Sequence, residues 1–201
     1  LLVAGPGVLA TLTFAPLVLS FFYSSKFGAA VGILRWICLG ATLQVITWPM
    51  GFISVAKGRQ GVFFFSEFAW TIFAVTAAWI CVKRYGLEGA GIAFFASYVF
   101  HWLITYPIAW HLTRFHWSSD TKRTGLMYCV LTAITFCGFQ KLPIWQATAV
   151  GALTFAFSVA YSARVLARLA PVDRLPRALQ RLLGWLGLAP ALAAVEVSAC
   201  N

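Results

Sequence analysis

Three ionisable side chains lie deep inside long apolar stretches of the sequence, and they are the residues best placed to do chemistry there. They are Arg35, Glu67 and His101. A charge held in hydrocarbon is costly unless it is paired, hydrated or able to reach the membrane surface, so such residues mark candidate functional positions. A carboxylate or an imidazole can bind a proton or a cation, and a guanidinium can bind a phosphate or an acidic sugar.

Glu67 lies about six residues, or ~9 Å, into a predicted helix, which is too deep for its short side chain to reach water easily. The same helical face carries Thr71 and two alanines, which suit close helix packing or the wall of a lumen. Two interpretations stay open. Glu67 either pairs with Lys57 or Arg59 at the same side of the membrane and pins a helix hairpin, or it couples a proton or cation to transport.

Arg35 enters its predicted helix from the opposite side, also by ~9 Å, so ~12 Å of a ~30 Å membrane would separate it from Glu67. We therefore expect no direct pair between them. Arg35 either extends outward beside Trp36 to the interface or turns inward as a cationic contact for a diphosphate or an acidic sugar.

His101 is expected near the centre of the membrane, ~18 Å from the end of its helix. Ser97 and Thr105 share its helical face, because they are one turn away on either side. His101 either packs as a neutral, hydrogen-bonded histidine or lines a cavity.

A fourth candidate feature is a stripe of small and polar residues formed by Gly40, Gln44, Thr47 and Gly51, spaced along one face of a single predicted helix. Such a stripe either lines a cavity, with Gln44 and Thr47 as the polar groups, or receives another helix at close range. Three prolines, Pro16, Pro49 and Pro107, lie within or near predicted spans and are expected to kink them.

The elements that must hold these residues are transmembrane helices. Apolar residues make up 61% of the 201 positions and charged residues only 10%, which excludes a water-soluble core. Six apolar runs are each near the ~20 residues that cross the hydrocarbon layer. They predict helices at 1–22, 30–56, 61–82, 89–112, 124–140 and 143–163. The fold class is therefore all-α, an integral membrane bundle of about six transmembrane helices over residues 1–165, followed by an amphipathic or disordered cytoplasmic tail at 166–201.

The net charge of +10 reflects membrane topology and does not indicate nucleic-acid binding, because the basic residues lie in short links and in the tail. Four basic residues belong to one set of alternate links: Lys26, Lys83, Arg84 and Lys141. Ten belong to the other links and the tail: Lys57, Arg59, Arg114, Lys122, Arg123, Arg164, Arg168, Arg174, Arg177 and Arg181. This imbalance predicts a cytoplasmic carboxy terminus.

Other signals are weak or missing. The five cysteines show no Cys-x-x-Cys spacing and no metal-site pattern, so we expect no metal and no cofactor. A membrane-embedded saccharide polymerase or acyltransferase is a poor fit, because there is no catalytic motif and only five carboxylates occur in the chain. We therefore expect no enzyme. The chain begins Leu1-Leu2-Val3-Ala4, already inside an apolar run, and is interpreted as a fragment.

One segment carries a family pattern. Residues 23–59 read YSSKFGAAVGILRWICLGATLQVITWPMGFISVAKGR, and Glu67 and the turn GLEGAGIA at 86–93 follow in order. This stretch resembles the O-antigen flippases of the multidrug/oligosaccharidyl-lipid/polysaccharide exporter superfamily. The resemblance fades from about residue 124.

The resemblance implies the second half of a pseudo-symmetric bundle of about twelve helices in the inner membrane. Such a transporter moves a polyprenyl-diphosphate-linked saccharide outward by alternating access. Its partners would be the lipid-linked saccharide, membrane lipids and the missing amino-terminal half, and the resemblance also leaves room for polysaccharide polymerase and assembly proteins. Arg35 is then the first candidate for the diphosphate, with Lys57 and Arg59 at the cytoplasmic mouth.

Two alternatives of other kinds stay open beside this one. The first is an exporter of small cationic drugs from the same superfamily, and the second is a non-transporting scaffold for cell-wall assembly. Aromatic and acidic cavity walls would favour a drug, whereas cationic walls would favour a saccharide.

Overall fold

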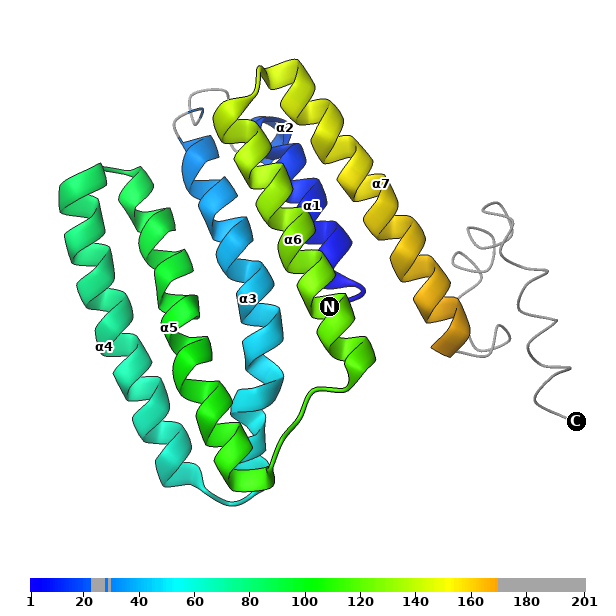
Figure 1. Cartoon of the computed structure of the whole chain (residues 1–201). Helices are drawn as coiled ribbons and strands as arrows, with labels where there is room; N and C mark the ends of the chain where they lie inside the picture. Colours follow the sequence, from blue (N-terminus) through cyan, green and yellow to red (C-terminus); the bar gives the residue numbers. More distant parts are fainter. Residues whose placement is uncertain (23–27, 29, 170–201) are drawn as a thin grey trace, which may run out of the picture.

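The computed structural model describes residues 1–22, 28 and 30–169, and every regular element in them is a helix. The predicted tail therefore lies almost wholly outside the described residues. The helices are α1 (Ala4–Thr13), α2 (Ala15–Phe22), α3 (Ala30–Ala56), α4 (Gln60–Tyr85), α5 (Glu88–Thr113), α6 (Ser119–Lys141) and α7 (Ile144–Leu169). All except α2 run roughly side by side as a slab, with α4 at one edge and α7 at the other (Figure 1).

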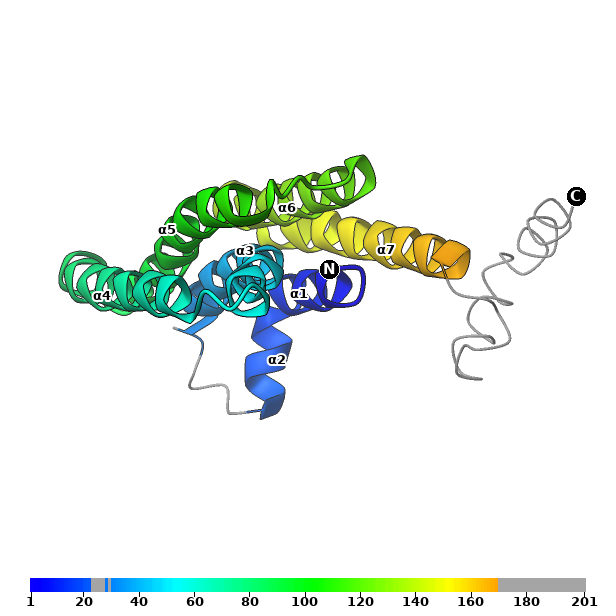
Figure 2. The same ribbon diagram turned by 90° about the horizontal axis from the view of Figure 1, so that it is seen from below.

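Five of the six predicted runs form single helices close to the expected bounds, but the first does not. Residues 1–22 form α1 and α2, which are bent by 86° at Phe14. Pro16 explains the break, because proline lacks an N–H and its ring clashes with the carbonyl four residues earlier, that of Leu12. As a result α2 projects away from the other helices (Figure 2), and Leu17, Phe21 and Phe22 are exposed on it.

Four of the described helices, α3, α4, α5 and α7, are long and apolar enough to cross a membrane, and the bent pair adds a fifth if it is one span. The chain is thus a multi-pass membrane protein. The remaining predicted span, 124–140, lies in α6, a helix of 23 residues that does not reach the same apolarity. Its first turn carries Asp120, Lys122 and Arg123, and hydroxyl side chains recur along it.

The hydroxyl groups of α6 point at neighbouring helices, which explains how a less apolar helix fits this bundle. Thr135 lies 2.8 Å from Thr154 of α7, between hydroxyl oxygens, and Tyr128 bonds Ser162 of α7. Thr132 lies 3.4 Å from Thr42 of α3. Buried hydroxyls that bond one another between helices cost the bundle far less than hydroxyls left facing hydrocarbon.

Helix α3 is the centre of the bundle and contacts α1, α2, α4, α5 and α6. Trp36 packs against Phe95 of α5 and Phe136 of α6, with ring centroids 5.9 and 4.6 Å apart. Gly40 lets α5 approach, since a Cβ there would lie 2.5 Å from the Phe94 ring. This part of the small-residue stripe therefore receives a helix at close range.

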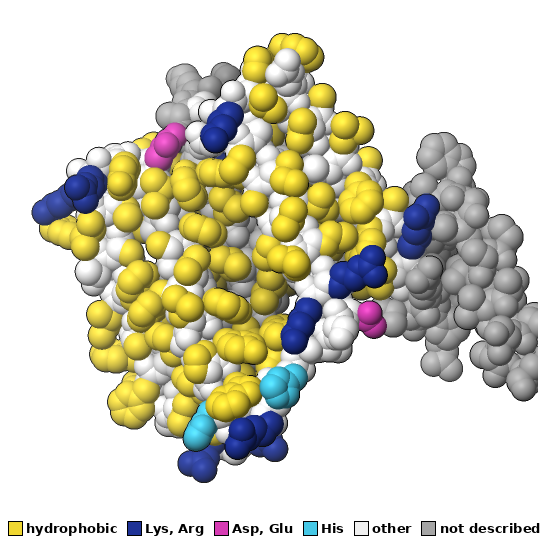
Figure 3. All heavy atoms as spheres, viewed as in Figure 1, with side chains coloured by type: hydrophobic (Ala, Val, Ile, Leu, Met, Phe, Trp, Pro, Cys, Tyr) yellow, Lys and Arg dark blue, Asp and Glu magenta, His cyan; other side chains and the backbone are white. Residues whose placement is uncertain are grey.

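The outer surface is strongly apolar, as a lipid-facing surface should be. Helix α4 buries none of its residues, and its exposed side chains include Phe64, Phe65 and Phe68. Figure 3 shows hydrophobic side chains across one whole face, with Lys and Arg side chains gathered toward its ends. This distribution is the one expected for helices whose middle sections face hydrocarbon.

The α4–α5 hairpin depends on two glycines in its turn. Gly86 has φ +62° and ψ −140°, a conformation that is essentially restricted to glycine. Gly89 is buried against the end of α4, where a Cβ would overlap the carbonyl group of Cys81. The two long helices can therefore start and end in contact only because these positions lack side chains.

We predict that Gly89→Ala destabilises the protein by about 1–3 kcal/mol, because the added methyl group must push α5 away from the α4 backbone. Gly61→Ala is the matched control, since a Cβ at Gly61 meets nothing within 4 Å and alanine is the better helix former. Thermal unfolding in detergent measures both. Equal stability of the two variants would contradict the close approach at Gly89.

Candidate functional site

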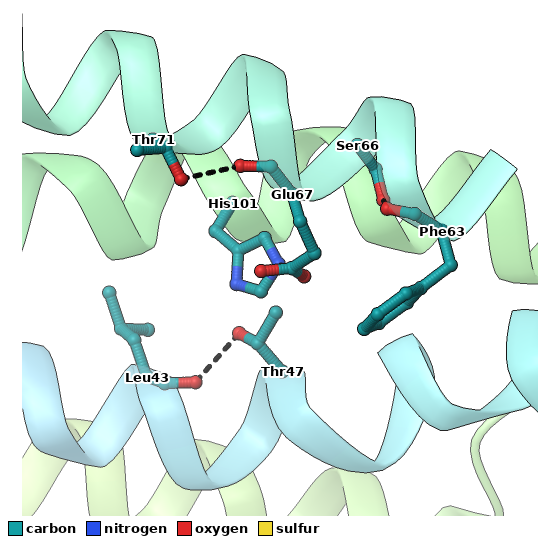
Figure 4. Close-up of polar contacts among 7 residues, drawn as sticks. All are labelled: Leu43, Thr47, Phe63, Ser66, Glu67, Thr71 and His101. Atoms are coloured by element: carbon teal, nitrogen blue, oxygen red, sulfur yellow. Dashed lines mark hydrogen bonds and ion pairs between the residues drawn. The ribbon is translucent and has the colours of Figure 1, made fainter. Parts of the chain in front are cut away.

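Glu67 of α4 and His101 of α5 make a side-chain hydrogen bond within the helical bundle. The carboxylate Oε1 lies 3.1 Å from the imidazole Nε2. The His101 side chain is 5% exposed and that of Glu67 31%, so the pair lies at the wall of the bundle and is not fully enclosed. With Glu67 ionised, the Nε2–H group donates to the carboxylate, which fixes the ring orientation. Figure 4 shows the two side chains meeting between their helices.

Aromatic rings pack beside the His101 imidazole. The Trp70 ring lies 5.1 Å from that of His101 and 5.6 Å from that of Tyr98. A cavity of about 170 Å³ adjoins the pair, between α3, α4 and α5. Its lining residues are Trp48, Gly51, Phe52, Phe63, Glu67, Trp70 and His101. Apart from Glu67 and His101, the lining residues are therefore apolar, and most of them are aromatic.

Three buried polar atoms near the pair have no hydrogen-bond partner within the described part of the chain. They are His101 Nδ1, Trp70 Nε1 and the Thr105 hydroxyl. Thr105 is one helical turn from His101, and the expectation that Ser97, His101 and Thr105 share one face is confirmed, since all three are buried. Buried polar atoms are normally satisfied by protein, water or an ion, so this group is suited to bind a small polar species.

Thr47 of α3 faces the pair from the third helix. Its side chain points toward the His101 ring (Figure 4), and its hydroxyl donates to the Leu43 carbonyl at 2.7 Å. A hydroxyl that donates in this way keeps a lone pair with which it can accept a second hydrogen bond. The Thr47 hydroxyl makes no hydrogen bond with His101 Nδ1 in this structure, so such a bond would require α3 to move toward α5.

The interpretation in which Glu67 pairs with Lys57 or Arg59 is wrong. In the described residues the side-chain partner of Glu67 is His101, and both basic residues are exposed at the link between α3 and α4. Arg59 precedes Glu67 by eight residues, or about 12 Å along the helix, whereas the facing helix α5 offers a partner at contact distance.

Arg35 and Gln44 do not join this site. The Arg35 guanidinium stacks on the Phe139 ring of α6, with its Cζ 3.9 Å from the ring centroid, and its Nε is buried without a partner in the described residues. The expectation that Arg35 does not pair with Glu67 is confirmed. Arg35 thus packs against a ring in the last turn of α6 and does not line the cavity beside Glu67. Gln44 is half-buried on α3 and does not line the cavity.

Comparison of the chain with protein-family models, with curated proteins and with solved structures finds no match. The function of the site must therefore be argued from its own chemistry. A carboxylate hydrogen-bonded to an imidazole can take up and release a proton, and the aromatic walls limit how water reaches it.

We predict that Glu67→Ala destabilises the protein by about 1–3 kcal/mol, because it leaves the buried imidazole N–H without an acceptor. Glu67→Gln should cost less, since the amide oxygen can still accept from Nε2. Denaturant unfolding in detergent micelles measures both variants. The control is Glu88→Ala, which removes an exposed carboxylate from the first turn of α5 and should cost about 0.3–1 kcal/mol. A Glu67→Ala variant as stable as the wild type would show that the pair is not formed.

Proposed function

We propose that the chain is the carboxy-terminal half of an inner-membrane transporter that moves a polyprenyl-diphosphate-linked saccharide outward by alternating access, with Glu67 and His101 as its proton-coupling pair. The observation that carries the proposal is the partly buried carboxylate–imidazole contact in a bundle of membrane-spanning helices. The excess of basic residues at one set of links supports a cytoplasmic carboxy terminus.

Proton binding at this pair changes the net charge of the site and therefore the cost of enclosing it within the bundle. An ionised Glu67 beside a neutral His101 carries one negative charge, which favours hydration and an open cavity. A further proton neutralises the site, and either an imidazolium–carboxylate pair or a neutral acid–imidazole pair can then be enclosed at lower cost. A closer approach of α3 would bring the Thr47 hydroxyl to a protonated Nδ1 as its acceptor. The pair is therefore able to link protonation to the packing of α3 against the α4–α5 hairpin.

The volume of the cavity suits a coupling ion and is too small for the cargo. Sites for drug-sized ligands commonly enclose 300–1,000 Å³, and the cavity beside Glu67 has about 170 Å³. A saccharide or a typical drug does not fit this volume, whereas water or a small cation does. We therefore assign the cavity to the coupling ion and place the cargo outside it.

The cargo contacts of this half are proposed at its basic residues. Lys57 and Arg59 are exposed in the link between the end of α3 and the start of α4. This is the end of the bundle nearer to Glu67. Both residues are candidates for first contact with the diphosphate. Arg35 lies toward the opposite end, half-buried against Phe139, and is a candidate for contact late in transport. A companion half would supply the facing wall.

The test is gradient-driven export by the complete transporter in proteoliposomes. We expect Glu67→Gln to lower export driven by a proton gradient at least tenfold while leaving exchange of labelled substrate without a gradient within about twofold, because the amide cannot bind and release the proton. Glu88→Gln, which changes an exposed carboxylate on the same hairpin, should match the wild type. Full gradient-driven export by Glu67→Gln would remove the pair from the coupling mechanism.

Export of small lipophilic cations is the second candidate function, because the walls of the cavity suit a cation small enough for its volume. Trp48, Phe52, Phe63 and Trp70 surround a carboxylate, and aromatic rings with an acidic group are a suitable environment for a cation. The two functions predict different effects of an added cation on export. A lipophilic cation should leave saccharide export unchanged if the cargo is a lipid-linked saccharide. It should be exported itself, and be blocked by Trp70→Ala, if the cargo is a cation.

A further inference from the structure

A long apolar groove runs along the bundle on the side of α5 that faces away from the Glu67–His101 pair. Two cavities, of about 490 and 360 Å³, share Leu43, Trp102 and Cys129 and so form one continuous groove. Helix α3 supplies the floor, and α5 and α6 supply the walls. Further lining residues are Leu1, which precedes α1, Leu39, Thr42, Val45, Ile46 and Pro49 of α3, Phe95 and Val99 of α5, and Gly125, Leu126, Thr132 and Ala133 of α6.

The groove opens toward the surroundings of the protein and not toward its core. Leu126 is 68% exposed and Trp102 38% exposed on its walls. Their helices carry further exposed apolar side chains, Leu103 on α5 and Val130 and Ile134 on α6. A lipid chain in the bilayer can therefore enter the groove sideways, without passing through the bundle.

One end of the groove is polar and basic. Lys122 and Thr121, in the first turn of α6, line it together with Trp117 of the α5–α6 link. Lys122 is exposed and makes no ion pair with another described residue. Nearby Asp120 lines a different cavity, with Leu2 and Thr124. A lysine and a tryptophan at the end of an apolar groove are suited to the phosphate and the interfacial region of a lipid.

The length of the groove selects the kind of lipid. From Lys122 to Ala133 the groove follows α6 for eleven residues, or ~16 Å. One leaflet contributes about half of the ~30 Å hydrocarbon layer, or ~15 Å. An acyl chain of a single-leaflet phospholipid therefore fills the groove when its phosphate lies at Lys122, whereas a polyprenyl chain is too long for it.

We propose that this groove is a binding site for an anionic bilayer phospholipid, with one acyl chain between α5 and α6 and its phosphate at Lys122. The site does not depend on the identity of the cargo or on proton coupling, because it shares no lining residue with the cavity beside Glu67.

The experiment is photo-crosslinking in phosphatidylcholine vesicles that contain a trace of phosphatidylglycerol with a diazirine in its acyl chain. Peptide mapping should place the label mainly on the groove walls around Trp102, Leu126 and Cys129. An excess of unlabelled phosphatidylglycerol should reduce this labelling at least fivefold, while labelling of the exposed Phe64 and Phe65 on α4 should change little. This competition needs no variant, so it remains decisive if a variant fails to fold.

Two variants test the parts of the site separately. Gly125 lines the groove, and a Cβ there meets nothing within 4 Å, so Gly125→Leu should fill the groove and lower its labelling about tenfold. Gly61→Leu, at an equally open position outside the groove, should not. Lys122→Gln should reduce the preference for phosphatidylglycerol over an equivalent phosphatidylcholine probe about fivefold, with Arg123→Gln as the control.

Three results would overturn the proposal. The first is labelling spread evenly over the apolar surface, with no competition by phosphatidylglycerol. The second is equal labelling by the anionic and zwitterionic probes in the wild type. The third is preferential displacement by a polyprenyl phosphate, which would assign the groove to a different lipid. None of these results bears on whether Glu67 and His101 couple protons to transport.

Discussion

Polar side chains inside hydrocarbon need partners inside the bundle, and this constraint shapes most of the structure. The Glu67–His101 contact joins α4 to α5, the Thr135–Thr154 contact joins α6 to α7, and the Thr42–Thr132 contact joins α3 to α6. Each contact satisfies two groups that lipid cannot satisfy. The same constraint accounts for the inner face of α6, whose hydroxyls bond α3 and α7, while its outer face carries exposed apolar side chains such as Leu126.

The regular helices could be predicted from sequence because crossing a membrane demands length and apolarity, and both can be counted. Helix α3 has the expected bounds of 30–56, and α4, α5, α6 and α7 differ from expectation by a few residues at their ends. The break between α1 and α2 was signalled by Pro16, but a proline also lies within the continuous helices α3 and α5. Pro49 and Pro107 show that the residue type alone does not decide between a kink and a sharp bend.

The members of the candidate site were found from sequence, but their partnership was not. Glu67 and His101 were singled out as ionisable residues in apolar runs, and Lys57 and Arg59 were considered as partners for Glu67 because they carry the opposite charge nearby in sequence. Eighteen residues separate Glu67 from the end of α4, and thirteen separate His101 from the start of α5. Counted from the α4–α5 turn, the two positions therefore differ by about five residues, or ~7 Å along the helix axes. Two long side chains can bridge this distance. Which faces of the helices meet depends on helix rotation, and that is fixed by packing such as Gly89 against Cys81.

Helices α3 and α5 each separate the proposed coupling site from the proposed lipid groove. On α5, His101 lines the cavity and the next residue, Trp102, lines the groove. On α3, Trp48 lines the cavity and Pro49 lines the groove. Consecutive residues of a helix point about 100° apart, so one helix can form a wall of both sites at the same level. A rotation or tilt of α5 against α3 would therefore move side chains in both sites at once. A lipid that binds one packing arrangement more tightly than another shifts the balance between them, so the phospholipid in the groove and the proton at Glu67 would act on the same pair of helices.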